Sequence, residues 1–343
     1  MRLPLNPSAM SRVLVRATNW LGDAVMSLPA LREIRRVFAH AEIAVAARPS
    51  VAGLYARENC IDRVILYPQG ERTQLVKQLR AEPFDCAILL QNAFDAALVA
   101  WRAGIPERIG YNRDGRGILL TRAIEVPEPG EIPRHERYYY LELLRRVGMI
   151  ERFPECSEIR LDGIAAARAA GASHLAAIGA SAPAVGISPG AAYGNAKRWI
   201  PERFAEVARD FLPASILVFG SAAERELCHS VAAAIPGARN LAGETSLAEF
   251  IDLAAACSLF LTNDSGAMHI ASALGVPTVT VFGSTDDTTT GPSSSLSRVV
   301  REHAECSPCL LRECPIDHRC MTRVTAAHVS AVAKQLWTRE ARP

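Results

Sequence analysis

Short, almost wholly apolar runs alternate along this chain with longer amphipathic stretches, and this alternation restricts the fold more than any other feature. Apolar runs of this kind are typical of strands buried on both faces of a parallel sheet. The pattern predicts strands at 12–18, 42–47, 63–67, 86–90, 184–190, 215–220, 259–264 and 278–283. Because apolar residues recur at spacings of three and four between these runs, we expect helices there and an α/β fold of βαβ units.

The alternation stops between residues 111 and 183, where turn residues and two helix-like stretches replace it. A chain of 343 residues is long enough for two domains. We therefore predict two Rossmann-like, doubly wound domains, over 1–170 and 171–325. A final helical segment, 326–343, could pack back on the N-terminal domain.

Composition restricts the classes of function. The chain is 49% hydrophobic and 22% charged, which is ordinary for a globular protein. Its net charge of +2 gives no electrostatic argument for a nucleic-acid partner. There is no apolar run of the roughly 18 residues that a membrane helix needs, and the first residues do not resemble a signal peptide. We expect a cytoplasmic protein, and nothing in the pattern points to a particular oligomeric state.

A single carboxylate follows the first predicted strand, in TNWLGDAV. Gly22 allows a tight turn there, and Asp23 opens the next helix at the edge of the sheet where α/β proteins bind ligands. Asp23 could act as a general base for an incoming hydroxyl. It could equally be a helix cap or a favourable partner for the helix dipole. The segment lacks the G-x-G-x-x-G and Walker patterns.

A second candidate site is SPGAAYGNAKRW, residues 188–199. The strand ends near Gly190, and a loop of small residues leads to Lys197. Backbone amides in such a loop suit a phosphate, and a lysine supplies a point charge. The chain has three lysines among its 38 basic residues, so lysine is not its usual surface cation. The alternative is an ordinary solvated loop lysine.

A third candidate site is TNDSGAMH, residues 262–269, where a strand ends and a helix begins. Free amides at a helix N-terminus, together with the Ser265 hydroxyl, favour an anion. Asp264 could instead be a cap, and His269 a core histidine. A hydrolase triad is not supported, because Asp264, Ser265 and His269 lie within six residues and G-x-S-x-G is missing.

Four of the nine cysteines lie close together near the C-terminus, as Cys306-x2-Cys309-x4-Cys314-x5-Cys320. Four thiols could hold a structural zinc ion. The spacing differs from a zinc ribbon, so local disulfides and free thiols remain alternatives. A disulfide framework would be unusual in a cytoplasmic protein.

The ordered set of motifs resembles glycosyltransferase family nine, the ADP-heptose:lipopolysaccharide heptosyltransferases. It is most similar to the branch that adds the second heptose, heptosyltransferase II. The similarity covers nearly the whole chain. It rests on RVLVRATNWLGDAVMSLPAL, GIPERIGY, SPGAAYGNAKRW, FGSAAERE, NLAGETSL and TNDSGAMHIASALGVPTVTVFGSTD.

The resemblance implies a GT-B fold with the active site between the domains. It implies inverting transfer of heptose from ADP-L-glycero-β-D-manno-heptose, with no metal or other cofactor required. Asp23 corresponds to the catalytic base, and Lys197 corresponds to a catalytic lysine that offsets charge on the departing ADP. The implied donor-binding residues are Gly22, Gly190, Lys197, Glu224, Glu244, Thr245, Asp264, Ser265, Gly266 and His269.

The expected acceptor is the inner core of lipopolysaccharide, which carries Kdo and is anchored by lipid A. Its negative charge suggests arginine contacts, for which Arg108, Arg113 and Arg116 are candidates. Peripheral contact with the inner membrane is compatible with such an acceptor. Alternatives are a different acceptor (heptose-free Kdo, another surface glycan or a protein) and a non-catalytic nucleotide- or metal-binding regulator. An NAD-linked oxidoreductase is disfavoured by the missing glycine fingerprint.

Overall fold

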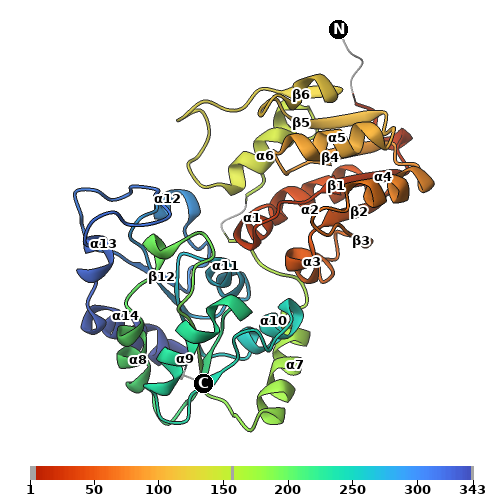
Figure 1. Cartoon of the computed structure of the whole chain (residues 1–343). Helices are drawn as coiled ribbons and strands as arrows, with labels where there is room; N and C mark the ends of the chain where they lie inside the picture. The colour runs from red at the N-terminus through yellow and green to blue at the C-terminus, as the bar shows by residue number, and fades with distance from the viewer. Residues whose placement is uncertain (1–4, 156–157, 341–343) are drawn as a thin grey trace. The chain divides into compact units, whose positions relative to one another are not determined.

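The computed structural model describes residues 5–155 and 158–340, without the side chains of 338–340. The chain divides into two compact units, Met1–Cys156 and Ser157–Pro343. The first unit runs from red to yellow-green in Figure 1, and the second from green to blue. No helix in the described residues is both long and apolar enough to cross a membrane.

The described part of the first unit contains one six-stranded parallel sheet. Its order is β3-β2-β1-β4-β5-β6, which is the doubly wound Rossmann order. The strands after β1 are added first on one side of it and then, from β4 on, on the other side. Doubly wound sheets bind ligands at this switch between β1 and β4. The strands are β1 (Arg12–Arg16), β2 (Glu42–Ala47), β3 (Arg63–Leu66), β4 (Cys86–Leu89), β5 (Glu107–Tyr111) and β6 (Arg122–Ile124).

Helices cover the first sheet with their apolar sides. Helices α4 and α5 form one core with alternate residues of β1 to β4, such as Leu14, Ile65 and Leu89. Elsewhere in this unit, α2 packs against α6. The helices are α1 (Leu21–Met26), α2 (Leu28–Val37), α3 (Pro49–Tyr55), α4 (Arg72–Ala81), α5 (Phe94–Arg102) and α6 (Arg137–Arg146), with the 3-10 turns η1 (Pro7–Ala9) and η2 (Arg116–Leu119).

The second unit repeats this topology in its described residues, with the order β12-β11-β10-β7-β8-β9. All neighbouring pairs are parallel, and the corresponding switch lies between β7 and β10. The strands are β7 (Ala184–Ser188), β8 (Ser215–Val218), β9 (Arg239–Asn240), β10 (Leu259–Asn263), β11 (Thr278–Val281) and β12 (Ser297–Val300).

Helices α8, α9 and α14 share one core with this sheet, and α7 packs against α10. Local sequence explains where several helices begin. Pro201 occupies the first turn of α8, and Ser246 and Glu249 form a capping box on α10. The helices are α7 (Ile164–Ala177), α8 (Pro201–Arg209), α9 (Arg225–Ala233), α10 (Leu247–Ala255), α11 (Gly266–Ala273), α12 (Asp287–Thr290), α13 (Arg319–Thr322) and α14 (Ala326–Glu340), with the turns η3 (Asn195–Lys197) and η4 (Ala222–Glu224).

All the strands predicted from the apolar runs are present, and the predicted class of two doubly wound α/β units is confirmed. The strands β5, β6, β9 and β12 were not predicted. They lie toward the outer edges of the sheets and carry charged or polar residues, such as Arg122 in β6 and Arg298 in β12. Because such strands lack a continuous apolar run, the pattern misses them.

Two predicted boundaries differ from the structure. The division at residue 170 would cut α7, which packs on α10 and belongs wholly to the second unit. Helix α14 packs on α8 and β11, so it completes the second unit instead of forming a separate segment. The helical stretch expected between the first two predicted strands is two helices that meet at Ser27. Pro29 lacks the N–H needed to continue one into the other.

Candidate functional site

In the second unit, two of the predicted motifs lie at the point where the strand order switches. The strands β7 and β10 are direct neighbours and run in parallel, so their carboxyl ends share one edge of the sheet. The segment 189–199 follows β7, and Asp264 follows β10. Strand pairing therefore brings these two segments, which are far apart in the sequence, to the same edge of the sheet. A ligand site in an open α/β sheet is expected at this edge.

An ion pair connects these two motifs. The Lys197 Nζ lies 2.6 Å from Oδ2 of Asp264, and the Thr285 hydroxyl donates to the same oxygen at 2.6 Å. Asp264 is 4% exposed, and the ammonium also lies 5.2 Å from the ring centroid of Tyr193. A lysine held in this way is not a solvated loop residue. Its charge is fixed beside the switch point, where it can meet an anionic ligand.

Asn263 fixes the backbone of the loop that carries the lysine. Its Nδ2 donates to the carbonyl of Pro189 at 2.7 Å, and its Oδ1 accepts from the N–H of Trp199 at 2.9 Å. Both ends of the 189–199 loop are thus tied to the end of β10. Because Asn263 is fully buried, these bonds are shielded from competing water.

Helix α11 begins directly after Asp264. Its N-cap is Ser265, whose hydroxyl lies 3.2 Å from Oγ1 of Thr262, so Asp264 is not the cap. Gly266 is the first helical residue, and His269 is buried one turn further along. The amides of this first turn follow directly after Asp264, which holds the Lys197 ammonium. Helix N-terminal amides and an ammonium both favour a negatively charged ligand.

Glu224 and Gly190 also come together. Glu224 accepts bonds from the N–H and hydroxyl of Ser221, at 2.9 and 2.8 Å, after β8. A β-carbon on Gly190 would overlap the Glu224 carboxylate, so this contact requires glycine. Glu244 is exposed and pairs with Arg225 at 3.1 Å, while Thr245 is half-buried next to it.

We expect Gly190→Ala to raise the KM for a donor nucleotide about tenfold, since the new methyl group must displace Glu224. The kcat should change little, because the lysine and Asp264 stay in place. Ser221→Ala is the matched control, since it removes one Glu224 hydrogen bond without adding volume, and it should have a smaller effect. Steady-state kinetics test this. An unchanged KM in the glycine variant would contradict a donor contact at Glu224.

In the first unit, Asp23 lies in the first turn of α1, half-buried, with Gly22 beside it. Its negative charge contributes to raising the pKa of Tyr55, Tyr140 and Glu136. Burial first, and then the Asp23 carboxylate, raises the pKa of Glu136 to about 7. Asp23 thus lies close to a second acid, Glu136, at the start of α1.

The raised pKa of Glu136 predicts a pH effect on stability. An acid whose pKa is higher in the folded state stabilises the fold below its unfolded value of 4.5 and loses that contribution as pH rises through about 7. The free energy of unfolding should fall by about 1 kcal/mol between pH 6 and pH 8. Urea titrations of Glu136→Gln should lack this fall. The exposed Glu128→Gln is the control, and equal slopes in both variants would contradict the assignment.

The three candidate acceptor arginines have different surroundings. Arg116 is fully buried and donates to the carbonyls of Gln91 and Tyr111 and to Asn92 Oδ1. Arg108 donates to the carbonyls of Ile105 and Leu119. A structural role accounts for both. Arg113 is about half exposed and hydrogen-bonds Tyr139, so it is the member of this set with a guanidinium open to a ligand.

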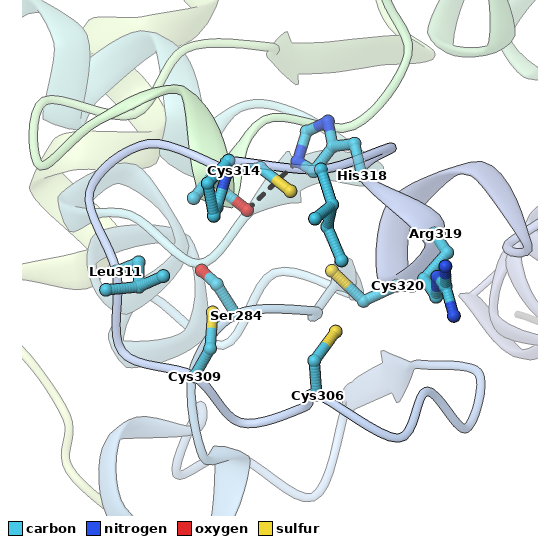
Figure 2. Close-up of a pocket in the computed structure, with 11 residues that line it drawn as sticks. Ser284, Cys306, Cys309, Leu311, Cys314, His318, Arg319 and Cys320 are labelled. Atoms are coloured by element: carbon cyan, nitrogen blue, oxygen red, sulfur yellow. Dashed lines mark hydrogen bonds between the residues drawn. The ribbon is translucent and has the colours of Figure 1, made fainter.

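The C-terminal cysteines gather around one cavity (Figure 2). All eight cysteines that the structure describes are free thiols. Burial, followed by the nearby thiols of Cys306, Cys309 and Cys314, raises the pKa of Cys320. Among the described residues, no three His, Cys, Asp or Glu side chains are already arranged so that they could bind a metal ion together.

Sequence reasoning did not single out three residues that the structure places at these sites. Thr285 follows β11 as Asp264 follows β10, so the rule that ligands lie beyond strand ends could have found it. Asn263 was read only as a strand end. Glu136 comes 113 residues after Asp23 and carries no motif, and only the packing of α6 brings it there.

Comparisons with known proteins identify the family of the chain. The family model described as "Glycosyltransferase family 9 (heptosyltransferase)" matches residues 72–319. The chain is 31% identical to Lipopolysaccharide heptosyltransferase 2 of Escherichia coli K12, over 84% of this chain and 88% of that one. It is 25% identical to Lipopolysaccharide heptosyltransferase 1 of Pseudomonas aeruginosa, over 88% of this chain and 87% of that one.

A solved structure, that of E. coli ADP-heptose LPS heptosyltransferase II, matches with a TM-score of 0.81 and 29% identity. The match covers 96% of this chain and 99% of the other. It confirms the predicted GT-B fold class. With the family model covering most of the chain and a relative above 30% identity, the chain belongs to glycosyltransferase family 9, the heptosyltransferases.

Proposed function

We propose that this protein transfers heptose from ADP-L-glycero-β-D-manno-heptose to the inner core of lipopolysaccharide, and that it adds the second heptose. The observation that carries the proposal is the buried Lys197–Asp264–Thr285 group beside the N-terminus of α11. A fixed cation and free helix amides match a diphosphate leaving group. The second-heptose assignment is supported by the 31% identity to a heptosyltransferase 2, against 25% to a heptosyltransferase 1.

The chemistry is a single displacement. The acceptor hydroxyl attacks the anomeric carbon of heptose, the bond to the ADP oxygen breaks, and the acceptor proton goes to Asp23 as general base. Lys197 offsets the negative charge that builds on ADP. One base and one stabilised leaving group suffice for inversion, so we propose that no metal ion takes part in the reaction.

The donor and acceptor sides of the proposal rest on different residues. Gly190, Glu224 and the start of α11 would hold the ADP part, with Gly22, Glu244, Thr245 and His269 as further donor contacts. Arg113 is our preferred acceptor contact in the first unit, because its guanidinium is exposed. The acceptor is anchored by lipid A, so we place the reaction at the cytoplasmic face of the inner membrane.

Mass spectrometry of reactions with purified protein tests the proposal. The mixture contains ADP-heptose and a lipopolysaccharide acceptor truncated after its first heptose. We expect the acceptor to gain the mass of one heptose while ADP is released. A gain only on the heptose-free Kdo acceptor would overturn the second-heptose assignment. If neither acceptor gains mass while the protein still binds ADP-heptose, lipopolysaccharide is not the acceptor. The assignment of ADP-heptose as the donor would then still stand.

A further inference from the structure

The cysteine cavity lies outside the site described above, and its lining is chemically unusual. Its volume is about 70 Å³, and four cysteines within one short segment contribute to its wall. Figure 2 shows Cys306, Cys309, Cys314 and Cys320 around the same space, with His318 at its rim. No carboxylate is among the lining residues. A cavity of this size is too small for an organic substrate, since ligand pockets usually exceed about 300 Å³.

The side chains favour a soft metal ion over other occupants. Thiolates select Zn²⁺ or iron, and four of them complete a closed tetrahedral site. His318 is a weaker ligand candidate because its Nε2 already lies 3.1 Å from the Ala196 carbonyl oxygen. The other described cysteines, Cys60, Cys86, Cys228 and Cys257, are each buried in the cores and are not part of this wall.

The segment that carries the cysteines lacks regular secondary structure, and its large apolar side chains are exposed. Residues 301–318 contain no helix or strand. The large apolar side chains Leu310, Leu311 and Ile316 are 60%, 45% and 60% exposed, so hydrophobic burial contributes little. Leu310 and His318 also have positive φ angles of 60° and 57°, which cost energy in residues other than glycine. Such a loop is typical of segments held by a metal or another cross-link.

The same loop contacts the segment that carries Lys197. The Ala196 N–H donates to the carbonyl of Arg312 at 3.0 Å, and the Tyr193 hydroxyl donates to that of Leu310 at 3.3 Å. A β-carbon on Gly194 would overlap the Arg312 backbone, so the two segments pack directly. On its other side the loop bonds Gly283 and Ser284, next to Thr285. It therefore supports both residues that hold the Asp264 carboxylate.

We propose that Cys306, Cys309, Cys314 and Cys320 bind one Zn²⁺ ion, and that this ion holds the loop that positions Lys197. Binding requires the thiols to lose their protons and to rotate about their Cα–Cβ bonds until the sulfurs close on one point. The ion takes no part in transfer. Its role in positioning Lys197 rests on the proposed function, whereas the metal site does not.

Metal analysis of the intact chain tests the site. Protein without a polyhistidine tag, purified from zinc-supplemented medium, should contain about one Zn²⁺ per chain, released when four thiols react with a mercurial. Cys306→Ser/Cys309→Ser should contain none. The control Cys228→Ser/Cys257→Ser should keep the ion, since serine hydroxyls can keep the carbonyl bonds of those thiols. Wild-type protein without metal, or with a disulfide in this segment, would overturn the proposal.

Calorimetric binding of ADP tests the positioning role. Chelation of the ion should weaken ADP binding by wild-type protein about tenfold, and added Zn²⁺ should restore it. Equal ADP affinity with and without the ion, at unchanged circular dichroism, would overturn the positioning role. If the zinc-loaded protein binds no ADP at all, the proposed function fails, while the metal content still decides the zinc site.

Discussion

Asp23→Asn is expected to lower kcat by about 10³-fold with little change in the affinity for ADP. A general base typically contributes 10²- to 10⁴-fold, and asparagine keeps the size and polarity of the side chain but cannot accept the proton. Asp23 lies in the first unit, whereas the proposed diphosphate contacts belong to the second. Donor binding should therefore survive. Single-turnover kinetics and ADP calorimetry on the same protein measure the two effects.

Asp95→Asn is the matched control for the base. Asp95 also lies in the first turn of a helix that follows a strand of the same sheet, and it pairs with Arg72. If Asp23 were only a favourable partner for the helix dipole, both variants would lose a similar, small amount of activity. A turnover of the Asp23 variant within a few-fold of wild type would exclude it as the base.

Lys197→Met should lower kcat and kcat/KM together, by about 10²- to 10³-fold. The charge that it offsets develops as ADP departs, so its interaction is stronger in the transition state than with the bound donor. Methionine keeps the unbranched apolar stem and removes the charge. The variant also removes one of the two groups that bond the buried Asp264 carboxylate and leaves the other, the Thr285 hydroxyl. A buried carboxylate without its cation can reduce stability. Thermal unfolding must therefore accompany the kinetics.

Lys334→Met provides the control for the loss of a lysine. Lys334 pairs with Asp210 at 2.9 Å on the surface of the second unit, and its loss should leave kcat unchanged. A variant of Lys197 with a raised KM but normal kcat would mean that the ammonium binds the donor equally well before and during the reaction. That outcome would remove it from the catalytic residues while keeping it in the donor site.

Sequence patterns predicted the inner part of each sheet and missed its edges. Strands such as β1, β4, β7 and β10 are apolar on both faces because helices cover them, so hydrophobicity alone identifies them. The edge strands β6, β9 and β12 are only partly buried and have no continuous apolar run. The two residues of β9 are recognisable only through their pairing with β8.

The candidate sites show the same division. The motifs around Asp23, Lys197 and Asp264 were identified from strand ends, small residues and the scarcity of lysine. The partners that define their chemistry, Thr285 for Asp264 and Glu136 for Asp23, were not. Arg116 was predicted to contact an acceptor, yet its guanidinium is fully buried and bonds the backbone. Charge is visible in a sequence, but burial is not.

By itself, the sequence determined the α/β class, the two doubly wound units and the motifs that follow their strands, because these depend on local hydrophobic periodicity and turn residues. Tertiary structure decided which side chains meet. The parallel pairing of β7 with β10 brings Lys197 to Asp264 across 67 residues. The loop that carries four cysteines lies against the lysine segment through backbone hydrogen bonds. Such contacts depend on strand order and packing, which no local pattern encodes.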